Sequence, residues 1–148
     1  MADILRSADA VWNGDLRGGT GEIDAQSGVI HDTPYSFATR FENKQGTNPE
    51  ELIASAHAAC YSMAFAATLG RHGHQPQQIK THATVTLAPQ QPSGFKITKI
   101  RLETTGTVPG IDEATFKQIA DEAEKGCPVS NLLRNGAEIE LDARLAGA

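Results

Sequence analysis

The stretch "NPEELIASAHAACYSMAFAATLG", residues 48–70, decides the fold of this chain. Asn48 fits a helix N-cap, Pro49 fits the first helical position, and the acidic Glu50 and Glu51 suit the first turn. Seven of the 18 residues at positions 52–69 are alanine, so other backbones can approach this helix closely. We therefore predict a helix over 48–70 that is covered on all sides.

Composition excludes several classes of protein. The chain has 148 residues, a net charge of −5 and no block of lysine and arginine, so we expect neither nucleic acid nor an anionic membrane as a partner. The N-terminus has no apolar run that would suit a signal peptide. The predicted helix opens with two glutamates and is interrupted by four polar side chains, which favours a core helix over a membrane span. These four are Ser55, His57, Ser62 and Thr68. We expect a cytoplasmic protein.

Short alternating segments flank this helix. Before it, residues 10–24 predict two strands joined by a turn, and residues 27–30 and 35–42 predict two further strands. After it, residues 78–89 and 94–108 predict two long strands. An amphipathic helix over 111–126, a short helix over 127–136 and a strand over 137–145 complete the chain.

The order of these elements favours the α+β class, because the strands cluster in antiparallel hairpins instead of alternating with helices. We expect a single domain over residues 1–148. One small sheet can cover only one side of an alanine-rich helix. Two chains that share two sheets around a pair of such helices would cover both sides, so we predict a homodimer.

The chain has two cysteines, which in the cytoplasm are more often free thiols or a working redox pair than a structural disulfide. Cys60 lies inside the apolar helix. It is either a small core residue or a reactive thiol whose raised pKa must be offset by a nearby cation. His57, three residues earlier, is one possible cation. Arg40 is the other, provided that the carboxylate of Glu50 holds its guanidinium through two parallel hydrogen bonds.

Cys127 lies 67 positions after Cys60, directly before Pro128. An N-cap cysteine meets the positive end of a helix and unpaired backbone N–H groups, and both favour the thiolate. The alternative is a cysteine that only packs at a helix junction. The sequence contains no Cys-x-x-Cys and no phosphate-binding glycine loop, and "RHGH" at 71–74 resembles a metal pair only superficially. We therefore predict no cofactor and no metal.

These residues carry a family resemblance. The segments "RFENKQGTNPEELIASAHAACYSMAFAATLG", "GFKITKI", "VPGID" and "GCPVS" strongly resemble the OsmC branch of the OsmC/Ohr peroxiredoxins. The similarity runs from "WNGDLRGGTG" to "AEIELDARL", which is nearly the whole chain. The resemblance implies an intertwined homodimer in which antiparallel sheets wrap around central buried helices.

The resemblance also implies an activity, the thiol-dependent reduction of peroxides with a preference for organic hydroperoxides. By motif match, Cys60 is the thiol that attacks the peroxide and Cys127 is the resolving thiol that forms a disulfide with it. Arg40 and Glu50 match the activating pair. The implied reductant is an external dithiol, such as a dihydrolipoyl group on a partner protein, and the implied setting is osmotic or oxidative stress. Two alternatives stay open, a redox sensor with slow turnover and a small-molecule binding module with structural cysteines.

Overall fold

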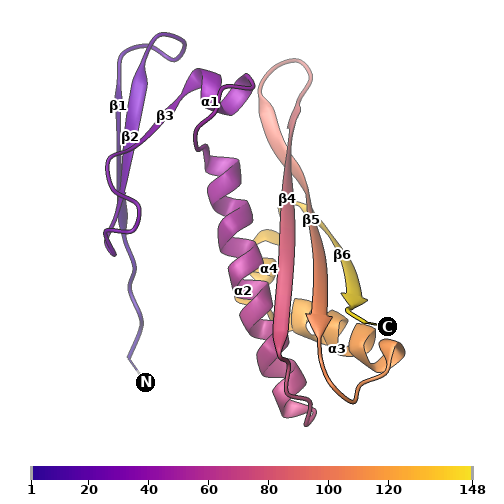
Figure 1. The fold of residues 1–148 in the computed structure, drawn as a ribbon. Helices are drawn as coiled ribbons and strands as arrows, with labels where there is room; N and C mark the ends of the chain where they lie inside the picture. The colour runs from indigo at the N-terminus through magenta and orange to yellow at the C-terminus, as the bar shows by residue number, and fades with distance from the viewer. Residues whose placement is uncertain (1, 148) are drawn as a thin grey trace. The chain divides into compact units, whose positions relative to one another are not determined.

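Two three-stranded sheets and four helices make up the part of the chain that the computed structural model describes, residues 2–147 (Figure 1). The predicted α+β class is confirmed. Contacts within the chain divide it into two compact units, Met1–Leu52 and Ile53–Ala148. Each unit is described by itself, and the expectation of a single domain over residues 1–148 stays a prediction.

The first unit contains an antiparallel sheet in the order β1-β2-β3, formed by Ala8–Asn13, Thr20–Ala25 and Thr33–Ser36. The predicted turn between β1 and β2 is confirmed. Gly14 has a φ of 95°, and the side chain of Asp15 accepts hydrogen bonds of 2.9 Å from the backbone N–H groups of Arg17 and Gly18. An aspartate that bonds the backbone two residues ahead is a local turn signal, which explains why this hairpin is readable from the sequence.

Two of the predicted strands are wrong. Residues 27–30 form a turn, in which Gly28 has a φ of 74° and the Val29 side chain is exposed. In residues 35–42 only the first two continue β3, and Phe37–Phe41 form the short helix α1. The cause is a reciprocal cap, because the backbone N–H of Thr39 donates to Ser36 Oγ at 3.3 Å and the Ser36 N–H donates to Thr39 Oγ1 at 3.0 Å.

The central helix α2, Pro49–Arg71, begins in the first unit and continues through the second. Its predicted start is confirmed, since Asn48 Oδ1 accepts a hydrogen bond of 2.8 Å from the Glu51 N–H. The second unit adds β4 (Gln78–Pro89), β5 (Phe95–Thr107), α3 (Glu113–Gly126), α4 (Pro128–Leu133) and β6 (Glu138–Leu145). These bounds lie within a few residues of those that the sequence predicts.

The second sheet has the order β4-β5-β6 and differs in one respect from the predicted antiparallel sheets. β4 and β5 pair antiparallel, but β6 pairs parallel to β5. The reason is the connection, because α3 and α4 carry the chain back before β6 begins, whereas a tight turn would give an antiparallel neighbour.

The core of the second unit lies between α2, α3 and one face of this sheet. Phe65 of α2 packs edge-on against Phe116 of α3, with ring centroids 4.9 Å apart, and both side chains are fully buried with Tyr61 and Leu102. Gly106 on β5 leaves room for this ring. A Cβ at that position would lie only 2.6 Å from Phe116 Cε2.

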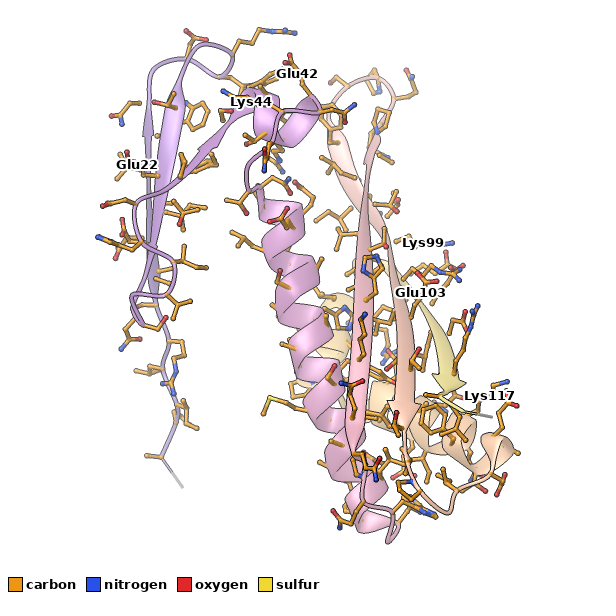
Figure 2. All side chains as sticks on the ribbon, in the orientation of Figure 1. Glu22, Glu42, Lys44, Lys99, Glu103 and Lys117 are labelled. Carbon is orange, nitrogen blue, oxygen red and sulfur yellow. The ribbon has the colours of Figure 1, made fainter. Side chains whose placement is uncertain are left out.

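The other face of the β5–β6 pair is charged. Lys99 and Glu103 lie on this face (Figure 2), and Lys99 Nζ pairs with Glu140 Oε1 at 2.5 Å. Arg101 contacts Glu140 and Asp142 at 3.6 Å. Charged residues therefore alternate along β5 with the buried Ile100, Leu102 and Thr104, which assigns the core to one side of the sheet.

Within the second unit, only one side of α2 is covered. By length and composition this helix could also cross a membrane, but Tyr61, Phe65 and Leu69 on it are fully buried in the core. The opposite side is exposed, including Met63 at 75%. That side carries small apolar residues at helical spacing, namely Ala56, Ala59 and Ala67. The second unit by itself therefore does not supply the predicted cover on all sides, and the homodimer stays a prediction.

Candidate active site

The two cysteines meet in the second unit. Cys60 lies in the middle of α2, and Cys127 ends α3 and caps α4, with Pro128 at the first position of α4. The two Sγ atoms are 3.5 Å apart although the residues are separated by 67 positions, and both cysteines are free thiols. Cys127 is fully buried, whereas Cys60 is partly exposed and lines a cavity. One sulfur is therefore accessible and the other lies directly behind it.

The cavity beside Cys60 has a volume of about 350 Å³ and a mostly apolar lining. Met63, Ala64 and Ala67 of α2 form one wall, Gly126 and Pro128 contribute from the other side, and Arg71 adds a cation. Such a lining accepts carbon-bearing groups more readily than water, because burial of apolar surface is favourable.

The environment of Cys60 opposes ionisation of its thiol. Partial burial raises the pKa of Cys60, and the neighbouring Cys127 adds to this effect. A hydrogen bond from the backbone N–H of Val129 to the Cys60 sulfur acts in the opposite direction and lowers that pKa. The raised pKa agrees with the expectation from the sequence that this thiol requires a cation before it can react.

The backbone donor does not reach the cysteine for which we expected it. Cys127 occupies the N-cap, but its side chain makes no capping hydrogen bond. Instead Val129, in the first turn of α4, donates to Cys60. The positive end of this short helix therefore faces the sulfur that comes from α2, which no spacing along the sequence could have indicated.

His57 is not the cation that Cys60 requires. Its side chain is fully buried, and burial lowers the pKa of its imidazole, with Arg134 acting in the same direction and Glu124 against it. The ring is thus neutral near pH 7. Its Nε2 lies 2.7 Å from the hydroxyl of Ser130, and its Nδ1 has no hydrogen-bond partner among residues 2–147.

Arg40 and Glu50 form the predicted ion pair within the first unit. Arg40 Nη2 donates to Glu50 Oε1 at 2.8 Å, and Arg40 Nε donates to Glu50 Oε2 at 3.2 Å. This fork geometry gives one fixed guanidinium orientation. The Asn48 side chain donates to the carbonyl of Thr39 at 3.1 Å, which links α1, where Arg40 lies, to the start of α2, where Glu50 lies. The catalytic role of the pair stays a proposal.

A second cavity, of about 250 Å³, adjoins this ion pair. Arg40 and Phe41 line it, and the guanidinium of Arg40 lies 5.1 Å from the centre of the Phe41 ring. The other apolar lining residues come from the strands and loops of the same unit, namely Trp12, Leu16, Tyr35, Phe37 and Pro49. Sequence reasoning did not identify this cavity, although the aromatic residues at 35, 37 and 41 were the available signal.

One group of side chains has the spacing of a cation site. Ligand atoms of Asp24, His31 and Asp32 lie within 4.8 Å of one another. His31 Nδ1 is 2.7 Å from Asp24, and the hydrogen bond to Asp24 raises the pKa of this histidine. The two carboxylates therefore favour a proton on His31, and this exposed cluster is sufficiently explained as an ion pair.

Known proteins include relatives that match nearly the whole of this chain. The family described as OsmC-like protein matches residues 41–142. Peroxiredoxin OsmC of Escherichia coli (strain K12) is 49% identical over 142 residues, which cover 96% of this chain and 97% of that protein. The organic hydroperoxide resistance protein of Xanthomonas axonopodis pv. citri (strain 306) is 34% identical, over 93% of this chain and 94% of that protein.

Solved structures agree with the fold. The crystal structure of the organic hydroperoxide resistance protein OhrB of Bacillus subtilis gives a TM-score of 0.72 at 23% identity, and covers 93% of this chain and 97% of that chain. An OsmC-like protein from Mycoplasma pneumoniae gives a TM-score of 0.75 at 18% identity, over 97% of this chain and 99% of that chain. The match over 41–142 and the identity to the Escherichia coli protein lead to one conclusion: this chain belongs to the OsmC-like family.

Proposed function

We propose that this protein is a thiol-dependent peroxidase that reduces organic hydroperoxides, and hydrogen peroxide less well, to alcohols and water. The observation that supports it best is the separation of 3.5 Å between the Cys60 and Cys127 sulfur atoms, one accessible and one buried. Family membership adds to this, since relatives at 49% and 34% identity are named a peroxiredoxin and an organic hydroperoxide resistance protein.

The proposed cycle begins at Cys60. Its thiolate attacks the outer oxygen of the peroxide, the O–O bond breaks, and the departing alkoxide takes a proton to become an alcohol. Cys60 is now a sulfenic acid. Cys127 then attacks the Cys60 sulfur, the S–S bond forms, the S–O bond breaks, and the hydroxyl leaves with the Cys127 proton as water. An external dithiol reduces the disulfide and completes the cycle.

We propose that Arg40, held by Glu50, supplies the positive charge that the Cys60 thiolate requires. An arginine stays charged at every relevant pH, so it can favour the thiolate and the departing alkoxide without exchanging protons. The fork of hydrogen bonds from Glu50 supports this role because it leaves one guanidinium nitrogen, Nη1, outside the ion pair's hydrogen bonds.

The apolar linings of the two cavities support the preference for hydroperoxides that carry a carbon group. The same proposal includes a homodimer, a cytoplasmic location and a dithiol reductant of the dihydrolipoyl type. The exposed apolar side of α2 supports the homodimer, since it would be covered by a second chain.

The test is intact-mass analysis under non-reducing conditions after one equivalent of cumene hydroperoxide. We expect a loss of two hydrogens per chain and a peptide that joins Cys60 to Cys127. Cys60→Ser should abolish peroxide consumption. If the protein were instead a small-molecule binding module, the same variant would keep its affinity for the ligand. A redox sensor would form the same disulfide, but steady-state consumption with a dithiol would be slow. Faster consumption of hydrogen peroxide than of cumene hydroperoxide would contradict the substrate preference.

A further inference from the structure

The hydrogen bond between His57 and Ser130 lies beside the cysteine pair and has no role in the cycle described so far. Both side chains are fully buried, and His57 Nε2 and Ser130 Oγ are 2.7 Å apart across 73 positions of sequence. His57 is three residues before Cys60 on α2. Ser130 is three residues after Cys127, in the first turn of α4.

The His57–Ser130 and Cys60–Cys127 contacts together define how α4 is aligned with α2. His57 meets Ser130 and Cys60 meets Cys127, so the two segments run in opposite directions with matching three-residue steps. Three residues are nearly one helical turn, which places each pair of contacts on one side of its helix. A contact between two thiols is weak and tolerates changes of geometry, whereas a buried hydrogen bond is directional.

Apart from the Val129 N–H that donates to Cys60, the side-chain contacts of α4 and its C-terminal end are directed elsewhere. Asn131 donates to the carbonyl of Lys125 at 3.0 Å, and Arg134 Nη2 donates to Glu124 Oε1 at 2.9 Å. Both connect α4 to the last turn of α3 and do not themselves fix its position along α2. The hydrogen bond from His57 to Ser130 is well suited to set that position. The other ring nitrogen of His57 has no hydrogen-bond partner among the described residues, so no second hydrogen bond directs the ring elsewhere.

We propose that His57 and Ser130 are positioning residues that hold the Cys127 sulfur against the Cys60 sulfur, so that disulfide formation follows oxidation of Cys60 before further peroxide can react. The inference rests on the proposed redox cycle. The two sulfurs must close from 3.5 Å to about 2.05 Å. A displacement of about 1 Å can slow such a reaction 100-fold. Loss of the hydrogen bond therefore slows the second step and leaves the attack on peroxide unchanged.

The test compares Ser130→Ala with a matched control, Ser62→Ala. Ser62 lies two residues after Cys60 on α2, but its hydroxyl donates to Thr81 of β4 at 2.8 Å, away from the His57–Ser130 hydrogen bond. The first readout needs no peroxide. Redox equilibrium with reduced and oxidised glutathione gives the effective concentration of one cysteine at the other. We expect it to fall at least tenfold in Ser130→Ala and to stay within twofold of wild type in Ser62→Ala.

The second readout separates the two chemical steps. After one equivalent of cumene hydroperoxide, Ser130→Ala should form the sulfenic acid within twofold of the wild-type rate but form the disulfide at least tenfold more slowly. His57→Leu should behave in the same way, and His57→Gln, whose side-chain amide can either donate to or accept from the Ser130 hydroxyl, should restore the wild-type rate. Urea unfolding of each variant identifies any that does not fold.

The outcomes are distinct. If Ser130→Ala and His57→Leu both fold and keep the wild-type effective concentration, the positioning role is wrong while the peroxidase cycle stands. If Ser62→Ala falls as far as Ser130→Ala, the effect is general loosening of the core and the positioning role is again wrong. If wild type forms no disulfide with peroxide, the proposed function itself fails, and this result is read from the wild-type protein alone.

Discussion

The closeness of the two sulfurs allows a quantitative prediction for Cys127→Ser. Serine fits the fully buried position of Cys127 with little change of volume, so the fold and the cavity beside Cys60 should survive. The variant can still react once with a hydroperoxide. It then lacks the internal thiol, so the Cys60 sulfenic acid must wait for a thiol from solution or react with more peroxide.

The geometry sets an upper bound for the magnitude. At 3.5 Å the sulfurs are at the outer limit of a near-attack arrangement, for which effective concentrations of roughly 10⁵–10⁸ M are the upper range. The sulfurs still have to approach, so we take a far lower value of about 1 M. Against about 1 mM external thiol this is a ratio of roughly 1000, or about 4 kcal/mol in barrier height. The sulfenic acid should therefore persist about 1000 times longer in the variant.

The assay is rapid mixing with one equivalent of cumene hydroperoxide, followed by quenching with a sulfenic acid-selective alkylating reagent and intact-mass measurement. Excess peroxide should convert the variant to a sulfinic acid, seen as two added oxygen atoms, while wild type stops at the disulfide. Cys60→Ser is the control and should show neither product. Equal sulfenic acid lifetimes in wild type and Cys127→Ser would refute the assignment of Cys127 as the resolving thiol.

Three further predictions concern other residues of the chain. Glu50→Gln should lower kcat/KM about fivefold, or about 1 kcal/mol. The effect should be modest because solvent partly screens the ion pair between Arg40 and Glu50, in which the Arg40 side chain is 38% exposed. Unchanged steady-state kinetics would exclude a role for this ion pair. Burial lowers the pKa of the His57 imidazole in the folded protein. Below about pH 6.5 the unfolded chain should therefore bind a proton at His57 more readily than the folded protein does. The free energy of unfolding should therefore decline with acid below that pH, and His57→Gln should decline less steeply; urea titrations with parallel pH profiles would argue against this. Gly106→Ala should cost about 1–3 kcal/mol and lower Tm, because its Cβ would lie 2.6 Å from the Phe116 ring; an unchanged Tm would contradict that packing.

Local chemistry explains why most elements could be predicted. The start of α2 is determined by the Asn48 side chain, and the start of α3 by Asp112, which accepts from the Thr115 N–H at 2.9 Å. These signals act within four residues, so they are visible in the sequence. The prediction of a strand over 35–42 was wrong because another short-range signal was not recognised. The alternation in this segment suits a strand, but the cap between Ser36 and Thr39 stabilises a short helix instead.

In the candidate site, too, some residues could be predicted from the sequence and others could not. Residue type and position made Cys60, Cys127, Arg40 and Glu50 candidates, and the family resemblance assigned their roles. Both signals were available because they depend on the chemistry of single side chains and on short motifs. The contributions of Val129 and Ser130 were not predictable. Each acts on a residue about 70 positions away, and no local pattern encodes such a contact.

The amino-acid sequence by itself determined the family, the α+β class, the ends of the long helices and the identity of the two thiols, since each depends on side-chain chemistry or on short-range backbone preference. Tertiary structure alone decided that β6 runs parallel to β5, that His57 is neutral and bonded to Ser130, and that the sulfurs lie 3.5 Å apart. The direction of β6 follows from the long connection through α3 and α4, and the other features arise where α4 meets α2, because burial and direction of approach act there between residues that are remote in the chain.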